Sequence, residues 1–181
     1  MGILADHQIH QRCVNERMVT PYDPMLVGPA SQDVRLGPLL LIESAESPKF
    51  VPYPFHKHSK EYPYRMAPGQ FLLAQTAEKF NLPTDVCADF YLKSSRGREG
   101  LDTTLKELGL DHVKARFADP GWNGSVLTLE LKNVRQLHPV LIWPGMLVGQ
   151  LKYSRMDENP ARSYAETGRY NGDDTVQQSK G

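Results

Sequence analysis

Residues 127–133 read Leu-Thr-Leu-Glu-Leu-Lys-Asn, and this stretch decides the fold. Apolar and polar side chains alternate in it with a period of two, which is typical of a β-strand that buries one face. The leucines share one face, and Thr128, Glu130 and Lys132 share the other. The pattern predicts a strand over residues 125–134 in which Glu130 is the lone carboxylate. A partly buried carboxylate has a raised pKa and suits acid–base catalysis; the alternative is a solvent-facing strand residue.

Two polar segments precede this strand. Residues 93–98 read Lys-Ser-Ser-Arg-Gly-Arg, and they combine hydroxyl groups with cations that suit phosphate, although a capped polar turn is the alternative. Residues 119–121 read Asp-Pro-Gly, which is also a common turn sequence. Asp119 is a candidate acceptor for a sugar hydroxyl. Trp122 is a candidate packing surface for a sugar ring, or else a core aromatic.

Composition limits the class of protein. The 181 residues fit one domain, and 14 proline and 14 glycine residues indicate many turns between short strands. Lys+Arg and Asp+Glu are 21 each, so no long-range field favours a nucleic-acid polymer or an anionic membrane. No apolar run reaches the roughly 18 residues of a membrane helix. Cys13 and Cys87 form no paired motif and are expected to be free thiols in a reducing cytoplasm.

Periodicity and turn residues predict the remaining elements. An N-terminal helix is expected over residues 3–18, ended by Pro21 and Pro24. A loop over 26–37 enters a strand, and residues 45–68, with five prolines, predict a long loop or flap. Further strands are expected at 39–42, 70–76, 86–92 and 112–117, a short helix at 103–108, and a final hairpin at 140–153. Beyond residue 156 the composition indicates a mobile tail.

Several short motifs, in order along the chain, resemble those of the dCTP deaminases of the trimeric dUTPase superfamily. They are PASQDVRLG (29–37), PGQF (68–71), KSSRGR (93–98), HVKA (112–115), DPGWNG (119–124), ELKN (130–133), PGM and GQL (144–151) and GRYNG (168–172). Each motif is weak by itself, but their shared order covers nearly the whole chain. The resemblance implies a mainly β, distorted jelly-roll-like barrel of the dUTPase type, with an N-terminal helix, in a single domain over 1–181. It also implies a homotrimer with sites at subunit interfaces.

The resemblance implies an activity and roles for particular residues. The reaction is metal-free hydrolysis of dCTP to dUTP and ammonia, with Glu130 as general base. Ser94 and the carbonyl group of Ala115 would hold the water, and Arg98 would be the cation beside it. Substrate-binding residues implied by the motifs are Lys93, Ser94, Ser95, Arg98, Asp119, Trp122, Tyr164, Arg169 and Tyr170. The last three belong to residues 163–181, which are expected to form a mobile lid over the phosphates.

The expected cofactor is Mg²⁺, bound through the substrate phosphates and water rather than by a protein cage. Zinc deaminases need an HxE…PCxxC set that this sequence does not contain. His56 and His58 are spaced i, i+2 without further apparent ligands, so no protein metal site is predicted. His112 is expected to be structural.

The chain departs from the family pattern at four places. Lys93 replaces an arginine, about eight residues near 102–109 are additional, one residue is additional before Glu130, and Asp173 replaces a frequent glutamine. The additional residue before Glu130 is the most consequential, because a slip of one residue reverses the faces of a strand. A β-bulge at residues 123–126 is expected to absorb it and to keep Glu130 inward. Without the bulge, Leu129 would occupy the catalytic position.

Two other functions stay open at this point. One is a dUTPase, or a bifunctional enzyme that deaminates dCTP and hydrolyses the product to dUMP. Asp119 stands where dUTPases carry an aspartate that activates water, but the resemblance implies an aspartate at this position in monofunctional deaminases as well, so Asp119 does not discriminate between these functions. Glu130 favours deamination, because dUTPases lack that glutamate. The other is a non-catalytic member of the superfamily that senses nucleotides or binds a partner through the additional residues near 102–109.

Overall fold

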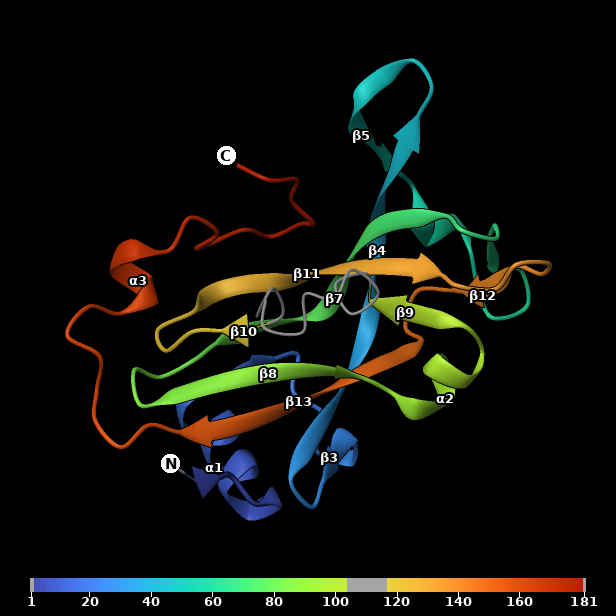
Figure 1. Cartoon of the computed structure of the whole chain (residues 1–181). Coiled ribbons are helices and arrows are strands. Elements are labelled where there is room, and N and C mark those ends of the chain that lie inside the picture. Colours follow the sequence, from blue (N-terminus) through green and yellow to red (C-terminus); the bar gives the residue numbers. More distant parts are fainter. Residues whose placement is uncertain (1, 104–116, 181) are drawn as a thin grey trace.

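The computed structural model describes residues 2–103 and 117–180, and in this part strands predominate (Figure 1). The helices are α1 (Asp6–Glu16), α2 (Ser94–Arg98) and α3 (Tyr164–Thr167), with 3₁₀ turns η1 (Pro24–Leu26) and η2 (Phe55–Lys57). The strands are β1 (Gly2–Ile3), β2 (Val19–Thr20), β3 (Val27–Gly28), β4 (Ser31–Ser44), β5 (Ser47–Tyr53), β6 (Tyr64–Met66), β7 (Phe71–Asn81), β8 (Val86–Leu92), β9 (Leu101–Thr103), β10 (Phe117–Ala118), β11 (Asn123–Asn133), β12 (Val140–Ile142) and β13 (Leu147–Arg155).

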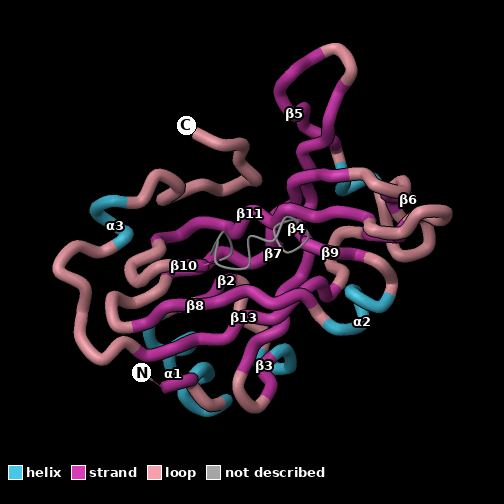
Figure 2. The backbone as a smooth tube through the Cα atoms, in the orientation of Figure 1, coloured by secondary structure: helices cyan, strands magenta, loops and turns pink. Residues whose placement is uncertain are grey.

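One curled sheet forms the body of the molecule (Figure 2). Its strand order is β10-β8-β13-β4-β7-β11-β9, and the pairs are antiparallel. The long strand β4 joins the two halves, because it pairs with β13 through residues 32–35 and with β7 through residues 36–42. At the junction, a Cβ on Gly37 would lie 2.7 Å from the side chain of Gln75, so only glycine permits this close approach. The half-barrel sheet confirms the predicted mainly β class.

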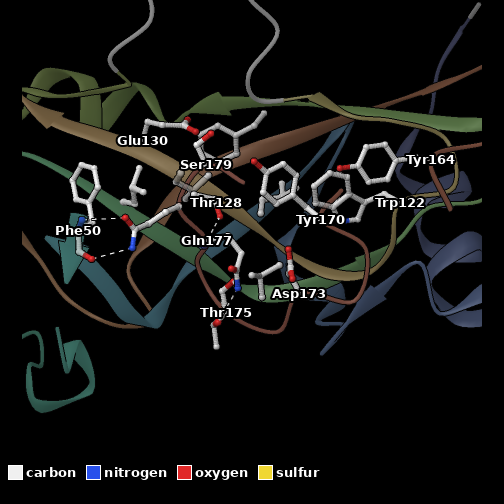
Figure 3. Close-up of a pocket in the computed structure, with 16 residues that line it drawn as sticks. Phe50, Trp122, Thr128, Glu130, Tyr164, Tyr170, Asp173, Thr175, Gln177 and Ser179 are labelled. Carbon is white, nitrogen blue, oxygen red and sulfur yellow. Dashed lines mark hydrogen bonds between the residues drawn. The ribbon is translucent and has the colours of Figure 1, made fainter. Parts of the chain in front are cut away.

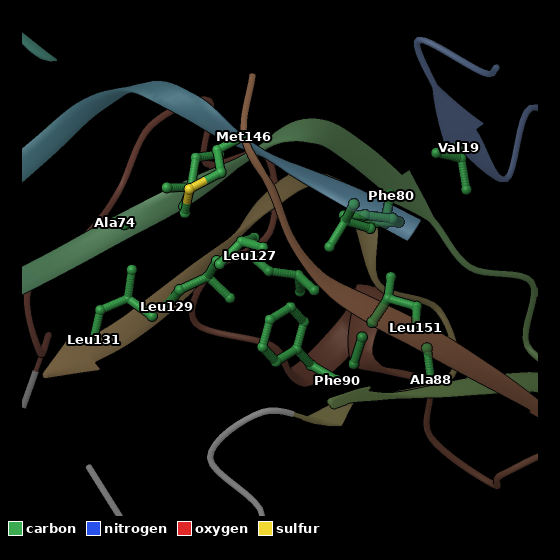
Figure 4. Packing of buried hydrophobic residues seen from close by; sticks show 14 of the residues in the cluster. Val19, Ala74, Phe80, Ala88, Phe90, Leu127, Leu129, Leu131, Met146 and Leu151 are labelled. Carbon is green, nitrogen blue, oxygen red and sulfur yellow. The ribbon is translucent and has the colours of Figure 1, made fainter. Parts of the chain in front are cut away.

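The main core joins buried side chains from strands across the sheet (Figure 4). Leu127, Leu129 and Leu131 of β11 are 5, 2 and 0% exposed, and they share one cluster with Phe90 of β8 and Leu151 of β13. The polar members of β11 alternate with these leucines and are half-buried. The two faces predicted from the period of two are therefore confirmed, and Glu130 lies on the face away from the leucines.

The structure corrects three predictions made from local sequence. The N-terminal helix ends at Glu16, where Arg17 adopts a left-handed conformation (φ 52°), and not at the prolines. Residues 45–68 are not one loop, because they contain β5, η2 and β6. The expected final hairpin does not exist, since β12 pairs with β6 whereas β13 pairs with β4 and β8.

Some other predictions fall outside the described residues, and the rest can be compared with the structure. The predicted helix at 103–108 and most of the strand at 112–117 lie outside the described residues, as do Ala115 and His112; Thr103 itself belongs to β9. Cys13 and Cys87 are buried, and neither forms a disulfide bond, as expected. Within residues 2–103 and 117–180, no helix has the length and apolar character needed to cross a membrane.

Candidate active site

Two register shifts precede Glu130 on strand β11. The register against β7 shifts between Asn123 and Ser125 and again between Val126 and Thr128, after which pairing is regular and Glu130 lies opposite Leu73. The first shift falls in the interval where a bulge was predicted, and it leaves Glu130 on the face away from the core. Leu129 packs in the core instead. The ungapped alternative, with Leu129 in place of Glu130, does not describe this strand.

Glu130 borders a cavity of about 530 Å³ between β11 and the C-terminal segment (Figure 3). Val126 and Thr128 of β11 lie along the same side of the cavity. The remaining lining residues come from the core, from β5 and from the segment after β13: Phe50, Leu73, Phe90, Trp122, Leu127, Leu129, Tyr164, Tyr170, Asp173, Thr175, Gln177, Gln178 and Ser179. A carboxylate thus borders a cavity with a largely apolar and aromatic wall.

The C-terminal segment is packed against the sheet in this structure. Val176 is 4% exposed and shares a second apolar cluster with Leu41 and Leu73, on the face of the sheet opposite the main core. Its backbone N–H donates to the side-chain oxygen of Gln75 (2.9 Å). The side-chain amide of Gln178 both accepts from the backbone N–H of Phe50 (3.1 Å) and donates to its carbonyl group (3.0 Å). Mobility of residues 163–181 stays a prediction, but the docked position forms one wall of the cavity.

The Asp-Pro-Gly-Trp turn positions Trp122 at one end of the cavity. The N–H of Trp122 donates to the carbonyl group of Asp119 (3.0 Å), and Gly121 has φ +86°, which is the geometry of a type II turn. Trp122 is 9% exposed, and its ring stacks on Tyr164 with centroids 4.8 Å apart. The backbone N–H of Tyr164 donates to the carbonyl group of Pro120 (2.9 Å). The turn and α3 therefore form one unit.

Burial and nearby carboxylates both act on the pKa of Tyr164. Burial raises the pKa of Tyr164, and the carboxylates of Asp119 and Asp173 add to the effect. The carboxylate of Asp173 is paired with the ammonium group of Lys180 (2.7 Å), which also lies 4.9 Å from the ring centroid of Tyr170. The residue that departs from the family's glutamine is therefore neutralised by a cation from the same segment.

The residues of the Lys-Ser-Ser-Arg-Gly-Arg motif lie at another place in the fold. Lys93 is the N-cap of α2 and the other five residues form the whole of this helix, and in the described part of the chain none of them lines the cavity of Glu130. Ser94 and Arg98 are exposed, and Ser95 is half-buried. Lys93 forms an ion pair with Asp33. Figure 1 shows α2 and α3 at opposite ends of the molecule.

Among the predicted site residues, the fold brings together Glu130, Trp122, Tyr164 and Tyr170. Asp119 adjoins this group through its turn, whereas Arg169 is exposed and outside the lining. Sequence reasoning did not assign Thr128, although the alternation of β11 placed it on the face of Glu130. Phe50 and Gln178 carried no sequence signal, because only the docking of the C-terminal segment brings them to the cavity.

Known proteins resemble this chain in sequence and in fold. A family model described as dCTP deaminase-like matches residues 3–156. A Beutenbergia cavernae protein named "dCTP deaminase, dUMP-forming" is 37% identical over 183 residues, covering 94% of this chain and 90% of its own. Proteins with the same name from Clavibacter michiganensis subsp. michiganensis and Mycolicibacterium smegmatis are 39 and 34% identical, covering 93 and 94% of this chain and 83 and 91% of their own.

A solved structure agrees at the level of the fold. The crystal structure of 2′-deoxycytidine 5′-triphosphate deaminase from Agrobacterium tumefaciens superposes with a TM-score of 0.63 at 21% identity. The match covers 86% of this chain and 49% of that one, so the chain spans about half the length of this structural neighbour. The family model and the curated relatives together show that this chain belongs to the dCTP deaminase family.

Proposed function

We propose that the protein deaminates dCTP and hydrolyses the resulting triphosphate, so that its products are ammonia, pyrophosphate and dUMP. The observation that carries the deamination is the position of Glu130, which faces a cavity with Trp122 at one end. The name shared by relatives that are 34–39% identical supports the second step. Our leading expectation from the sequence was release of dUTP, and the relatives' name favours the bifunctional alternative instead.

In the proposed deamination, Glu130 takes a proton from water as the water adds to C4 of cytosine. The same carboxyl group then gives this proton to N3, takes the second proton from the hydroxyl group added at C4 and passes it to the leaving amine, so that the C4 carbonyl group forms and ammonia departs. Acid–base catalysis of this kind is most efficient when the pKa of the group lies near the working pH. Half-burial beside an apolar wall favours a carboxyl group that can both accept and return a proton.

In the proposed hydrolysis, water attacks the α-phosphorus and pyrophosphate leaves. Asp119 is the candidate for orienting this water, since it projects from the turn that also carries Trp122 and stands where dUTPases carry such an aspartate. Mg²⁺ would accompany the triphosphate through phosphate oxygens and water. Asp173 is not offered as a ligand for it, because its carboxylate is already paired with Lys180.

The second part of the proposal concerns assembly. Ser94, Ser95 and Arg98 carry the groups expected to meet phosphate and water, yet they lie outside the cavity of Glu130 in the same chain. This separation supports a homotrimer in which α2 of one subunit adjoins the cavity of another. Light scattering tests it, because a stable and fully active monomer would contradict an interface site. The cytoplasmic location that we also propose rests instead on Cys13 and Cys87, which form no disulfide bond.

Two assays run in parallel test the proposed reactions. The protein is incubated with Mg²⁺ and either dCTP or dUTP, and ammonia and pyrophosphate are both measured. A bifunctional enzyme releases both from dCTP in equal amounts. Ammonia without pyrophosphate would identify a deaminase that stops at dUTP. Pyrophosphate from dUTP alone would identify a dUTPase, and release of neither would favour the non-catalytic, nucleotide-sensing alternative.

A further inference from the structure

The aspartate of the early PASQDVRLG motif has no role in the proposed chemistry, but it occupies a specific place in the fold. Asp33 lies on β4, directly opposite Gln150 of β13, and its carboxylate accepts a hydrogen bond from the amide of Gln150 (2.9 Å). The same carboxylate forms an ion pair with Lys93. The side chains of Asp33 and Lys93 are only 18 and 24% exposed. The pair is therefore well shielded from solvent.

This pair holds the residue at which β8 ends and α2 begins. The backbone N–H of Lys93 donates to the carbonyl group of Val148 on β13 (3.0 Å), and the carbonyl group of Lys93 accepts the first hydrogen bonds of α2, from Arg96 (2.9 Å) and Gly97 (3.1 Å). Lys93 is thus fixed at its backbone by one strand and at its side chain by another.

The polar side chains of the motif form two groups, one held within the chain and one exposed. Arg96 is held from within the chain, by the carboxylate of Glu99 (2.6 Å) and by the sulfur atom of Met146 (3.5 Å), and its side chain is 18% exposed. Ser94 and Arg98, in contrast, are exposed on the same short helix. Lys93 and Arg96 therefore anchor α2, while Ser94 and Arg98 are available to a ligand.

We propose that Asp33 is a positioning residue of the nucleotide site: through Lys93 and Gln150 it fixes the start of α2, so that Ser94 and Arg98 meet the ligand in a defined orientation. This inference rests on the proposed function. It assigns the ammonium group of Lys93 to Asp33 rather than to phosphate, which was our expectation from the sequence. A hydrogen bond between charged groups suits this role, because it is roughly twice as strong as one between neutral groups.

The matched test compares two carboxylates. Asp33→Asn removes the charge that holds Lys93, and Asp85→Asn removes a similarly shielded carboxylate (26% exposed) that pairs with Arg12 at the far end of β8. Small misplacements of binding groups can cost about 10²-fold in rate. We therefore expect kcat/KM for dCTP to fall by roughly 10- to 100-fold in Asp33→Asn. We expect little change in kcat/KM for Asp85→Asn when both variants are assayed well below their melting temperatures. Hydrogen exchange of residues 93–98 should accelerate only in Asp33→Asn.

A charge exchange separates positioning from direct phosphate binding. The double variant Asp33→Lys with Lys93→Asp restores an ion pair of the same combined length, and it should recover much of the activity and of the slow exchange. If Lys93 instead binds phosphate, the double variant will stay as impaired as Lys93→Met, and the proposal is overturned. Equal effects of Asp33→Asn and Asp85→Asn on activity and exchange would overturn it as well. If the parent protein acts on neither dCTP nor dUTP, the proposed function fails, and the exchange data still decide the role of Asp33.

Discussion

Trp122 and Tyr164 stack with their ring centroids 4.8 Å apart and their planes at 21°. One ring belongs to the turn that precedes β11, and the other begins α3, forty-two residues later. Both line the cavity that Glu130 borders. The contact therefore couples the position of the C-terminal segment to the part of the site that carries Asp119.

Replacing Tyr164 tests this coupling. Tyr164→Ala removes the stacked ring, and aromatic pairs contribute about 0.5–1.5 kcal/mol beyond area burial. We expect a higher KM for dCTP, because closure of the site by the C-terminal segment is weakened. Tyr164→Phe keeps the ring and should behave like the parent protein. Steady-state kinetics of both variants decide the point, and unchanged kinetics in Tyr164→Ala would show that the stack does not serve closure.

Glu130→Gln tests the proposed base. Glutamine keeps the size of the side chain and its hydrogen bonds but cannot take a proton from water. General acid–base catalysis typically contributes about 10²–10⁴ in rate, so kcat for ammonia release should fall at least that far. Binding of dCTP should persist, and pyrophosphate release from dUTP should change much less, since that water is assigned to Asp119. Deamination at near the parent rate would remove Glu130 from the mechanism.

Val176 tests the anchor of the C-terminal segment. Val176→Ala removes two buried methyl groups from the cluster with Leu41 and Leu73, which should cost about 1–2 kcal/mol of docking free energy. Limited proteolysis should then cut the segment faster, and KM for dCTP should rise. Val14→Ala is the control, because Val14 is 57% exposed on α1. Identical proteolysis of the two variants would show that burial of Val176 does not anchor the segment.

Cys13 makes the stability of the protein depend on pH in the alkaline range. Burial raises the pKa of its thiol from 9.0 to about 12 in the folded state. The folded protein therefore keeps a proton that the unfolded chain loses, and unfolding free energy must fall as pH rises from about 9 towards 12, by at most about 1.4 kcal/mol per pH unit. Below pH 9 the thiol is protonated in both the folded and the unfolded states, so the stability that its burial maintains is fully present. Cys13→Ala should show a shallower decline in chemical denaturation at pH 8.5–10.5; an identical decline would contradict the assignment.

Metal dependence distinguishes the proposed chemistry from that of zinc deaminases. Both activities should require Mg²⁺, since the proposed role of the ion is to neutralise the phosphates. A zinc-selective chelator should leave ammonia release unchanged when Mg²⁺ is in excess. Stoichiometric zinc in the purified protein, with loss of turnover when it is removed, would defeat the metal-free mechanism.

Local sequence was sufficient wherever a pattern repeats over a few residues. The period of two in β11 correctly divided the leucines from Glu130, and the single additional residue before Glu130 correctly indicated a bulge, because side-chain alternation admits no other way to preserve both faces. The Asp119-Pro-Gly turn followed from the φ preferences of proline and glycine. The ordered motifs led to the family that the comparisons show.

Tertiary structure decided what depends on partners distant in the chain. β12 pairs with β6 rather than with its neighbour β13, since a strand pairs with whichever edge the folded sheet presents. Lys93 meets Asp33, sixty residues away, only because β4, β13 and β8 lie side by side. Val176 belongs to a segment whose composition predicts a polar tail, yet it is buried, because the chain returns to the apolar patch that Leu41 and Leu73 form on the outer face of the sheet.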